Sequence, residues 1–209
     1  VIPTIDDNTK NITGVTWNSV AMTQLYYREA TNLVDVSFWY LANPDTGNNN
    51  IVVTLAGSTS GGYAVSALTL QDCAQSSPTD GTNGSGGSGT SQSASITSTV
   101  DGDLYLVVLV NRSGTSYVDN GTQTRVAELT NFDGSGDNFL VSEQAQTSAG
   151  ALSMGYSWTT SGGNDLGVIT LKYAAPPSLI KTFNGLANAS TKTVNGLARA
   201  SVKTWNGLA

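Results

Sequence analysis

The chain contains no histidine and only one cysteine, Cys73, in 209 residues. The missing histidine excludes Ser-His-Asp and Cys-His catalytic arrangements and makes a typical zinc site improbable. A pair of carboxylates is the remaining catalytic chemistry, and Glu143, after a short apolar run, is its least implausible member. With one cysteine there can be no disulfide within the chain, and a lone cysteine after an apolar run is most often a small core residue. We therefore expect no enzyme, no cofactor and no bound metal.

Charge is also scarce, at 11% of residues, and no apolar run approaches the 18 residues that would predict a membrane-spanning helix. The segment 178–209 carries four basic residues and no acid. Subtracting this +4 from the total of −6 leaves −10 for the rest of the chain. An acidic body and a sparsely basic tail argue against nucleic-acid binding, which needs a dense basic patch. The 39% hydrophobic content is too high for a disordered chain. The chain begins with Val1 instead of Met, which suggests a processed product.

The sequence has the period of two that is typical of β-strands, with β-branched and aromatic residues between Gly-, Asn- and Asp-rich turns. Asn18-Ser19 between two short apolar runs predicts a tight hairpin, and Asp101-Gly102 predicts a turn. No convincing helical pattern interrupts them, so the chain is expected to be all-β, a jelly roll or β-sandwich built from two packed sheets. The strands are predicted at 34–41, 51–55, 63–70, 104–110, 139–141, 152–158 and 166–173.

Two segments rich in small residues or proline punctuate the chain. The Gly/Ser/Thr/Asn stretch between Pro78 and Ser95 has the composition of a flexible loop. Ala174-Ala175-Pro176-Pro177 follows the last strong strand and is the better domain boundary. We therefore predict a sandwich over residues 1–175 and a separate tail over 176–209.

The tail repeats one eleven-residue pattern three times, and near identity makes this the most specific signal in the sequence. The period is set by Lys181, Lys192 and Lys203. Each repeat contains an Asn-Gly dipeptide, at 184–185, 195–196 and 206–207, which favours a type I′ turn because both residues tolerate positive φ. Nine residues remain for each strand, so the tail is predicted to be a short β-hairpin ribbon with one small-residue face and one face that is apolar at its ends and basic in its middle.

Such a ribbon has too little apolar surface to stand alone and needs a partner. Its own acidic body, a neighbouring body and an intertwined trimer all remain open, as do a stacked solenoid and a partly disordered duplicated tail. The residues expected to make the assembly contacts are Lys181, Phe183, Leu186, Lys192, Val194, Leu197, Arg199, Lys203, Trp205 and Leu208.

Several segments carry a resemblance to a known family. The runs at 13–23, 39–44, 51–55, 77–80 and 167–172 resemble a jelly-roll domain family of surface proteins from uncultivated bacteria and of phage virion proteins. This resemblance covers roughly residues 12–173, and the Lys-Thr-x-Asn-Gly-Leu-Ala repeats resemble the tails of predicted phage structural proteins. It implies a fold and an exterior location but no activity. Family members have two further strands before the position of Val1. If those strands are absent here, the sheet would have an open groove that a neighbour's strand could cover.

Three other patterns are candidate sites. Tyr26 and Tyr27 are adjacent aromatics of which one must point outward, and they are the candidate glycan-binding residues. Asp133-Gly-Ser-Gly-Asp137 spaces oxygen ligands as calcium would require, but it lacks the rest of an EF-hand loop and is more simply a turn. Asn-x-Ser/Thr sequons, possible glycosylation sites on an exterior protein, begin at Asn11, Asn83, Asn111, Asn120 and Asn188.

Together these features predict a structural or adhesive subunit of an extracellular filament or virion fibre, located outside the cell or on a virion. Its main partner would be itself, through the tail and possibly through strand donation. The alternative is a carbohydrate-binding module that binds surface glycans and uses its tail to oligomerise.

Overall fold

The computed structural model describes residues 1–6, 11–29, 34–59 and 61–174, together with the backbone of four short strands between 182 and 198. The chain forms two compact units, Val1–Ala174 and Ala175–Ala209. The described residues contain strands but no helix, which confirms the all-β prediction. No helix among them could therefore cross a membrane.

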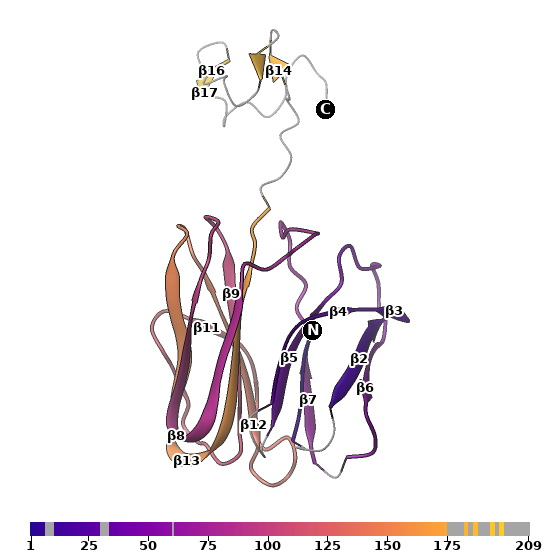
Figure 1. Ribbon diagram of the computed structural model, residues 1–209, viewed down its shortest axis with the longest axis vertical. Helices are drawn as coiled ribbons and strands as arrows, with labels where there is room; N and C mark the ends of the chain where they lie inside the picture. Colours follow the sequence, from indigo (N-terminus) through magenta and orange to yellow (C-terminus); the bar gives the residue numbers. More distant parts are fainter. Residues whose placement is uncertain are drawn as a thin grey trace. The chain divides into compact units, whose positions relative to one another are not determined.

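The first unit contains three antiparallel sheets (Figure 1). The four-stranded sheet has the order β4 (Thr23–Glu29), β5 (Asp35–Tyr40), β1 (Ile2–Ile5), β7 (Tyr63–Ser66). The six-stranded sheet has the order β10 (Val118–Asp119), β13 (Ala151–Leu171), β9 (Leu104–Asn111), β12 (Asn138–Ala145), β11 (Thr124–Leu129), with β8 (Thr82–Thr97) also paired to β13. The three-stranded sheet has the order β3 (Val20–Ala21), β2 (Ile12–Trp17), β6 (Ile51–Leu55).

Local sequence signals give many of these elements. The strands predicted at 34–41, 51–55 and 104–110 are confirmed as β5, β6 and β9. Asn18 and Ser19 have φ values of 48° and 66° between paired Trp17 and Val20, which confirms the tight hairpin. A turn at Asp101-Gly102 is also confirmed, with Gly102 at φ 86°.

Three hydrophobic clusters fill the spaces between and within the sheets, so the unit has more layers than the predicted two. The central core lies between the four- and six-stranded sheets and includes Phe38, Val108 and Ile169. A second core fills the inside of the six-stranded sheet, which bends over itself and encloses residues such as Tyr105 and Tyr156. The third and smallest core lies between the four- and three-stranded sheets.

The prediction of a flexible loop between Pro78 and Ser95 was wrong. These residues form most of β8, a 16-residue strand that pairs along almost all of β13. The predicted strands at 152–158 and 166–173 are likewise joined in the single 21-residue strand β13. The register shifts between Ser157 and Gly162, where β13 passes from pairing with β10 to pairing with β9. A long partner strand supplies the backbone hydrogen bonds that the Gly- and Ser-rich composition of β8 could not predict.

Small residues in β8 and β13 allow the neighbouring sheet to pack closely. A Cβ atom on Gly84 would lie 2.5 Å from the backbone oxygen of Leu166 and 2.1 Å from the Tyr26 hydroxyl. On Gly167 it would lie 2.9 Å from the Tyr26 ring. Composition that is typical of linkers therefore serves close packing between sheets here.

The second unit contains two short hairpins. β14 (Thr182–Phe183) pairs with β15 (Leu186–Ala187), and β16 (Thr193–Val194) pairs with β17 (Leu197–Ala198). In each hairpin the paired strands are separated by the two residues of one Asn-Gly dipeptide. The third repeat and the remainder of the predicted nine-residue strands lie outside the described residues.

Candidate functional site

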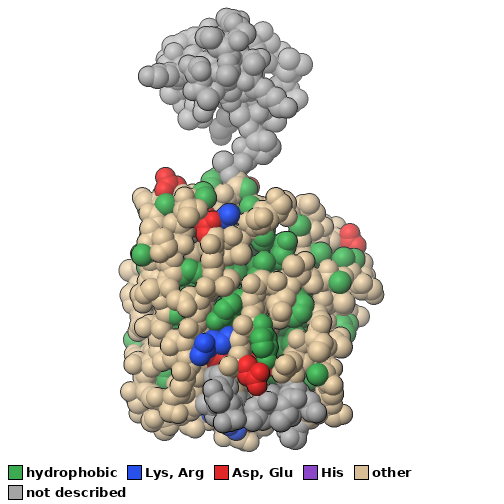
Figure 2. Space-filling view, in the orientation of Figure 1, with side chains coloured by type: hydrophobic (Ala, Val, Ile, Leu, Met, Phe, Trp, Pro, Cys, Tyr) green, Lys and Arg blue, Asp and Glu red, His purple; other side chains and the backbone are tan. Residues whose placement is uncertain are grey.

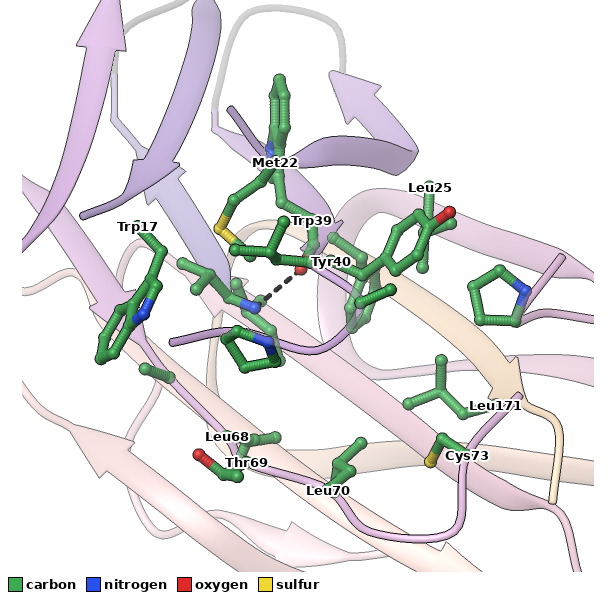
Figure 3. A pocket seen from close by; sticks show the side chains of 18 of the residues that line it. Trp17, Met22, Leu25, Trp39, Tyr40, Leu68, Thr69, Leu70, Cys73 and Leu171 are labelled. Carbon is green, nitrogen blue, oxygen red and sulfur yellow. Dashed lines mark hydrogen bonds between the residues drawn. The ribbon is translucent and has the colours of Figure 1, made fainter. Parts of the chain in front are cut away.

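One cavity of the first unit is an apolar pocket of about 220 Å³ at one end of the central core. All three sheets contribute to it, with Trp17 from β2, Trp39 from β5 and Leu171 from β13 (Figure 3). Residues of the segments 41–44 and 67–75 also line it. In the space-filling view, hydrophobic side chains gather over the region between the four- and six-stranded sheets (Figure 2).

Three of the polar groups near this pocket form hydrogen bonds with other parts of the chain. The Trp39 indole nitrogen donates to the Ser37 hydroxyl at 3.0 Å, and the Trp17 indole nitrogen donates to the Asp45 carbonyl at 3.2 Å. The amino nitrogen of Val1 donates to the Trp39 carbonyl at 2.8 Å. No residue in the lining has a charged side chain. The pocket is therefore suited to hold an apolar group and offers no acid–base pair for catalysis.

Cys73, predicted to be a core residue, is half-buried and lines this pocket as a free thiol. Burial, followed by the nearby charges of Asp72 and Asp103, raises the pKa of the thiol. Because the thiolate is the reactive form, we expect iodoacetamide to alkylate Cys73 at pH 7.5 at least tenfold more slowly than it alkylates free glutathione. Mass spectrometry of timed samples would measure this, and alkylation at the rate of glutathione would show that the thiol is neither buried nor raised in pKa.

The two candidate glycan-binding tyrosines do not form an exposed platform. Both are half-buried. The Tyr26 ring lies 6.2 Å from the Phe38 ring at the edge of the central core. The Tyr27 hydroxyl donates to Asp35 at 3.0 Å and lies 3.2 Å from Glu29, and burial together with these carboxylates raises the tyrosine pKa. Their positions favour a packing role, and glycan binding remains a prediction.

The sequons lie in different environments. Asn11 and Asn83 are exposed and Asn120 is half-buried, whereas Asn188 lies outside the described residues. Asn111 is fully buried, and its side-chain oxygen accepts hydrogen bonds from the Ser113 backbone and the Tyr117 hydroxyl. Burial makes Asn111 the least accessible of these sequons in the folded protein, and glycosylation at all of them remains a prediction.

The residues predicted to make assembly contacts are only partly within the described part of the chain. Strand pairing places Phe183 opposite Leu186 and Val194 opposite Leu197. The other six, Lys181, Lys192, Arg199, Lys203, Trp205 and Leu208, lie outside the described residues.

The sequence pattern indicated only two of the three members of one cluster of carboxylates. Asp133 and Asp137, weighed as a calcium loop and predicted to be a turn, lie together with Asp6. The sequence carried no signal for Asp6, because more than a hundred residues separate it from the other two. The three side chains are the only cluster of potential metal-binding residues found in the described part of the chain.

No family model, curated protein or solved structure matches this chain.

Proposed function

We propose that this protein is a jelly-roll-like structural or adhesive subunit of an extracellular filament or virion fibre, and that it assembles through its C-terminal repeats. The observation that carries this proposal is the open apolar pocket in the first unit, combined with an apolar pair across each Asn-Gly dipeptide of the described hairpins. In an assembly, the hairpin of one subunit would insert its apolar side chains into the pocket of the next.

The size and polarity of the pocket fit such an occupant. An apolar cavity of about 150 Å³ accepts a benzene ring. A pocket of about 220 Å³ is thus large enough for Phe183 or Trp205, the aromatic residues that precede two of the three Asn-Gly dipeptides. Burial of one aromatic side chain removes about 150–250 Å² of surface from water.

Charge favours the same pairing between subunits. The tail carries +4 and the rest of the chain −10, so the tail of one copy is attracted to the acidic unit of another. A contact between two different surfaces of identical subunits is heterologous, and such contacts close into rings or continue as filaments.

An edge strand supports strand addition as a further contact. Within the described residues β7 pairs only with β1, and its Tyr63 and Val65 are 68% and 41% exposed. An edge with unpaired backbone groups and exposed apolar side chains is suited to accept an additional strand. A strand donated by a neighbouring subunit would cover it.

The proposal predicts that residues 178–209 are required for assembly. We expect the full chain to form polymers visible by electron microscopy, and a chain ending at Ala174 to elute as a monomer in size-exclusion chromatography. The triple substitution Phe183→Ser, Val194→Ser and Trp205→Ser should abolish polymers in the full-length chain, because it removes the apolar residue before each turn. Polymers that persist in both variants would contradict the proposal.

The pocket can be tested separately. Ala67 lines its mouth, so Ala67→Trp should fill it and reduce polymerisation at least tenfold. Ala21 is exposed on β3 and does not line the pocket, so Ala21→Trp serves as the matched control. Equal polymerisation by both variants would exclude the pocket as the docking site.

A further inference from the structure

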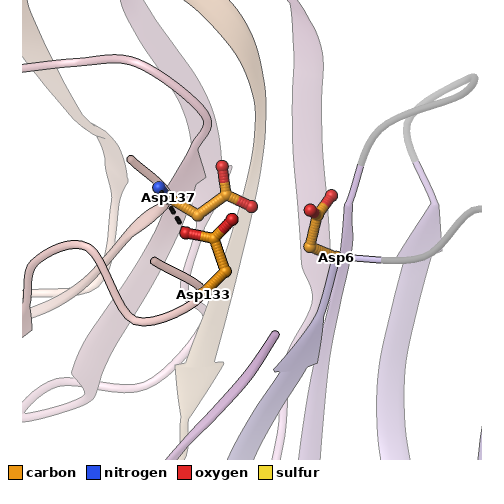
Figure 4. A group of neighbouring side chains, drawn as sticks. All are labelled: Asp6, Asp133 and Asp137. Carbon is orange, nitrogen blue, oxygen red and sulfur yellow. Dashed lines mark hydrogen bonds between the residues drawn. The ribbon is translucent and has the colours of Figure 1, made fainter. Parts of the chain in front are cut away.

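Three carboxylates from distant parts of the sequence meet where the four- and six-stranded sheets approach each other. Asp6 follows the end of β1, whereas Asp133 and Asp137 belong to the turn between β11 and β12 (Figure 4). Each residue contributes one carboxylate oxygen, and these three oxygens lie within 4.8 Å of one another. Figure 4 shows the three side chains directed toward one another.

The backbone around this cluster is shaped to bring the carboxylates together. One oxygen of Asp133 accepts hydrogen bonds from the backbone nitrogens of Ser135 at 2.9 Å, Gly136 at 3.1 Å and Asp137 at 2.9 Å. Gly62 accepts a hydrogen bond from the Asp6 nitrogen at 2.9 Å, and a Cβ atom on Gly62 would lie 2.4 Å from the Asp133 Cβ. Only glycine permits this approach of the two segments.

Asp137 is buried, and one of its two carboxylate oxygens has no hydrogen-bond partner. Its side chain is 2% exposed, and the oxygen without a partner is Oδ2. A buried carboxylate oxygen without a donor is costly unless a cation or a proton satisfies it.

Protein charge nearby balances only part of the cluster. The Arg112 Nε atom lies 3.5 Å from Asp6 and 3.9 Å from Asp137, and its side chain is 42% exposed. It is the cation paired with this cluster among the described residues. One positive charge against three negative charges leaves a deficit of two.

We infer that Asp6, Asp133 and Asp137 form a binding site for one calcium ion. Calcium binds carboxylate oxygens at about 2.3–2.6 Å, so ligands on opposite sides of the ion are about 5 Å apart, which agrees with the spacing of this cluster. The flexible coordination of calcium tolerates an irregular set of ligands, whereas magnesium requires near-ideal octahedral geometry and retains several waters. A bound ion would join β1 of one sheet to the β11–β12 turn of the other.

Thermal unfolding of the full chain tests this inference. After treatment with EDTA and dialysis, addition of 1 mM calcium chloride should raise the Tm by about 5 °C or more, as expected for free ion about 100-fold above the Kd. Magnesium at the same concentration should raise it by less than half as much. No shift with calcium would overturn the site, and an equal shift with magnesium would overturn the assignment to calcium.

Substitution of Asp137 provides the specific control. Asp137→Asn should raise the Tm of the ion-free protein, because it removes a buried negative charge next to two others, and should abolish the calcium-dependent shift. Asp72 is exposed and remote from the cluster, so Asp72→Asn should keep the full shift. Isothermal titration calorimetry should show at least a 100-fold weaker Kd for calcium in Asp137→Asn. A calcium shift that survives in Asp137→Asn would overturn the inference.

Discussion

Replacement of Arg28 by methionine is expected to lower the free energy of unfolding by about 1.5–3 kcal/mol, the usual contribution of a hydrogen bond to a charged group. The Arg28 Nε atom on β4 lies 2.5 Å from the Asp165 Oδ1 atom on β13, so this ion pair joins the four- and six-stranded sheets. The Asp165 side chain is completely buried, whereas that of Arg28 is 32% exposed. Methionine retains the apolar stem of the arginine but leaves the Asp165 carboxylate without this cation.

A double-mutant cycle separates the loss of charge pairing from other effects. Arg28→Met combined with Asp165→Asn should be more stable than Arg28→Met alone, because asparagine removes the buried negative charge that Arg28 pairs with. It also keeps a side-chain oxygen for the Leu166 backbone nitrogen, which donates to Asp165 Oδ1 at 3.0 Å. Urea denaturation followed by tryptophan fluorescence measures all four proteins. A loss below about 1 kcal/mol in Arg28→Met would indicate a pair that is solvated like a surface salt bridge.

The second large effect is expected at Gly84, where alanine should cost about 3 kcal/mol, the upper end of the usual penalty for overpacking a core. The added Cβ would lie 2.5 Å from the Leu166 backbone oxygen, and β8 cannot move away without losing its pairing with β13. The Tyr26 hydroxyl would also have to move. Urea denaturation measures the loss.

Gly87, on the same strand, is the matched control for this substitution. A Cβ atom there would have no atom within 4 Å. Gly87→Ala should therefore change the unfolding free energy by no more than about 0.5 kcal/mol. Equal behaviour of the two alanine variants would mean that β8 does not pack against β4 as described.

The same close packing between the sheets determines the environment of Tyr26. Gly84 lies next to its hydroxyl and Gly167 next to its ring, and burial is the largest cause that raises the pKa of the hydroxyl. A tyrosine held in this way stabilises the contact between two sheets. Loss of glycan binding in a Tyr26 variant would consequently need a stability measurement beside it, because unfolding would produce the same result.

The assembly proposal and the calcium site can fail independently. The assembly proposal depends on the pocket and the tail. The calcium site depends on Asp6, Asp133 and Asp137, which do not line the pocket and do not belong to the tail. Calcium-dependent stability without polymers would support the calcium site and contradict the assembly proposal. Polymers without calcium-dependent stability would support assembly and contradict the calcium site.

The sequence by itself determined the features that depend on near neighbours. Continuous β-branched and aromatic runs fixed β5 and β9, because such residues suit a pleated, buried strand wherever it pairs. Turn chemistry located the hairpin at Asn18-Ser19, since the positive φ that the turn needs is a property of those two positions. Absence of histidine likewise limited the catalytic chemistry without any structure.

Only the tertiary structure decided what depends on distant partners. β8 has the composition of a linker and becomes a strand because β13 supplies its hydrogen bonds and Tyr26 needs the space that its glycines leave. The group formed by Asp6, Asp133 and Asp137 exists because two sheets bring a strand end and a turn together. Local periodicity reports the preference of a segment, but backbone pairing and charge clustering arise between segments, so no single stretch of sequence records them.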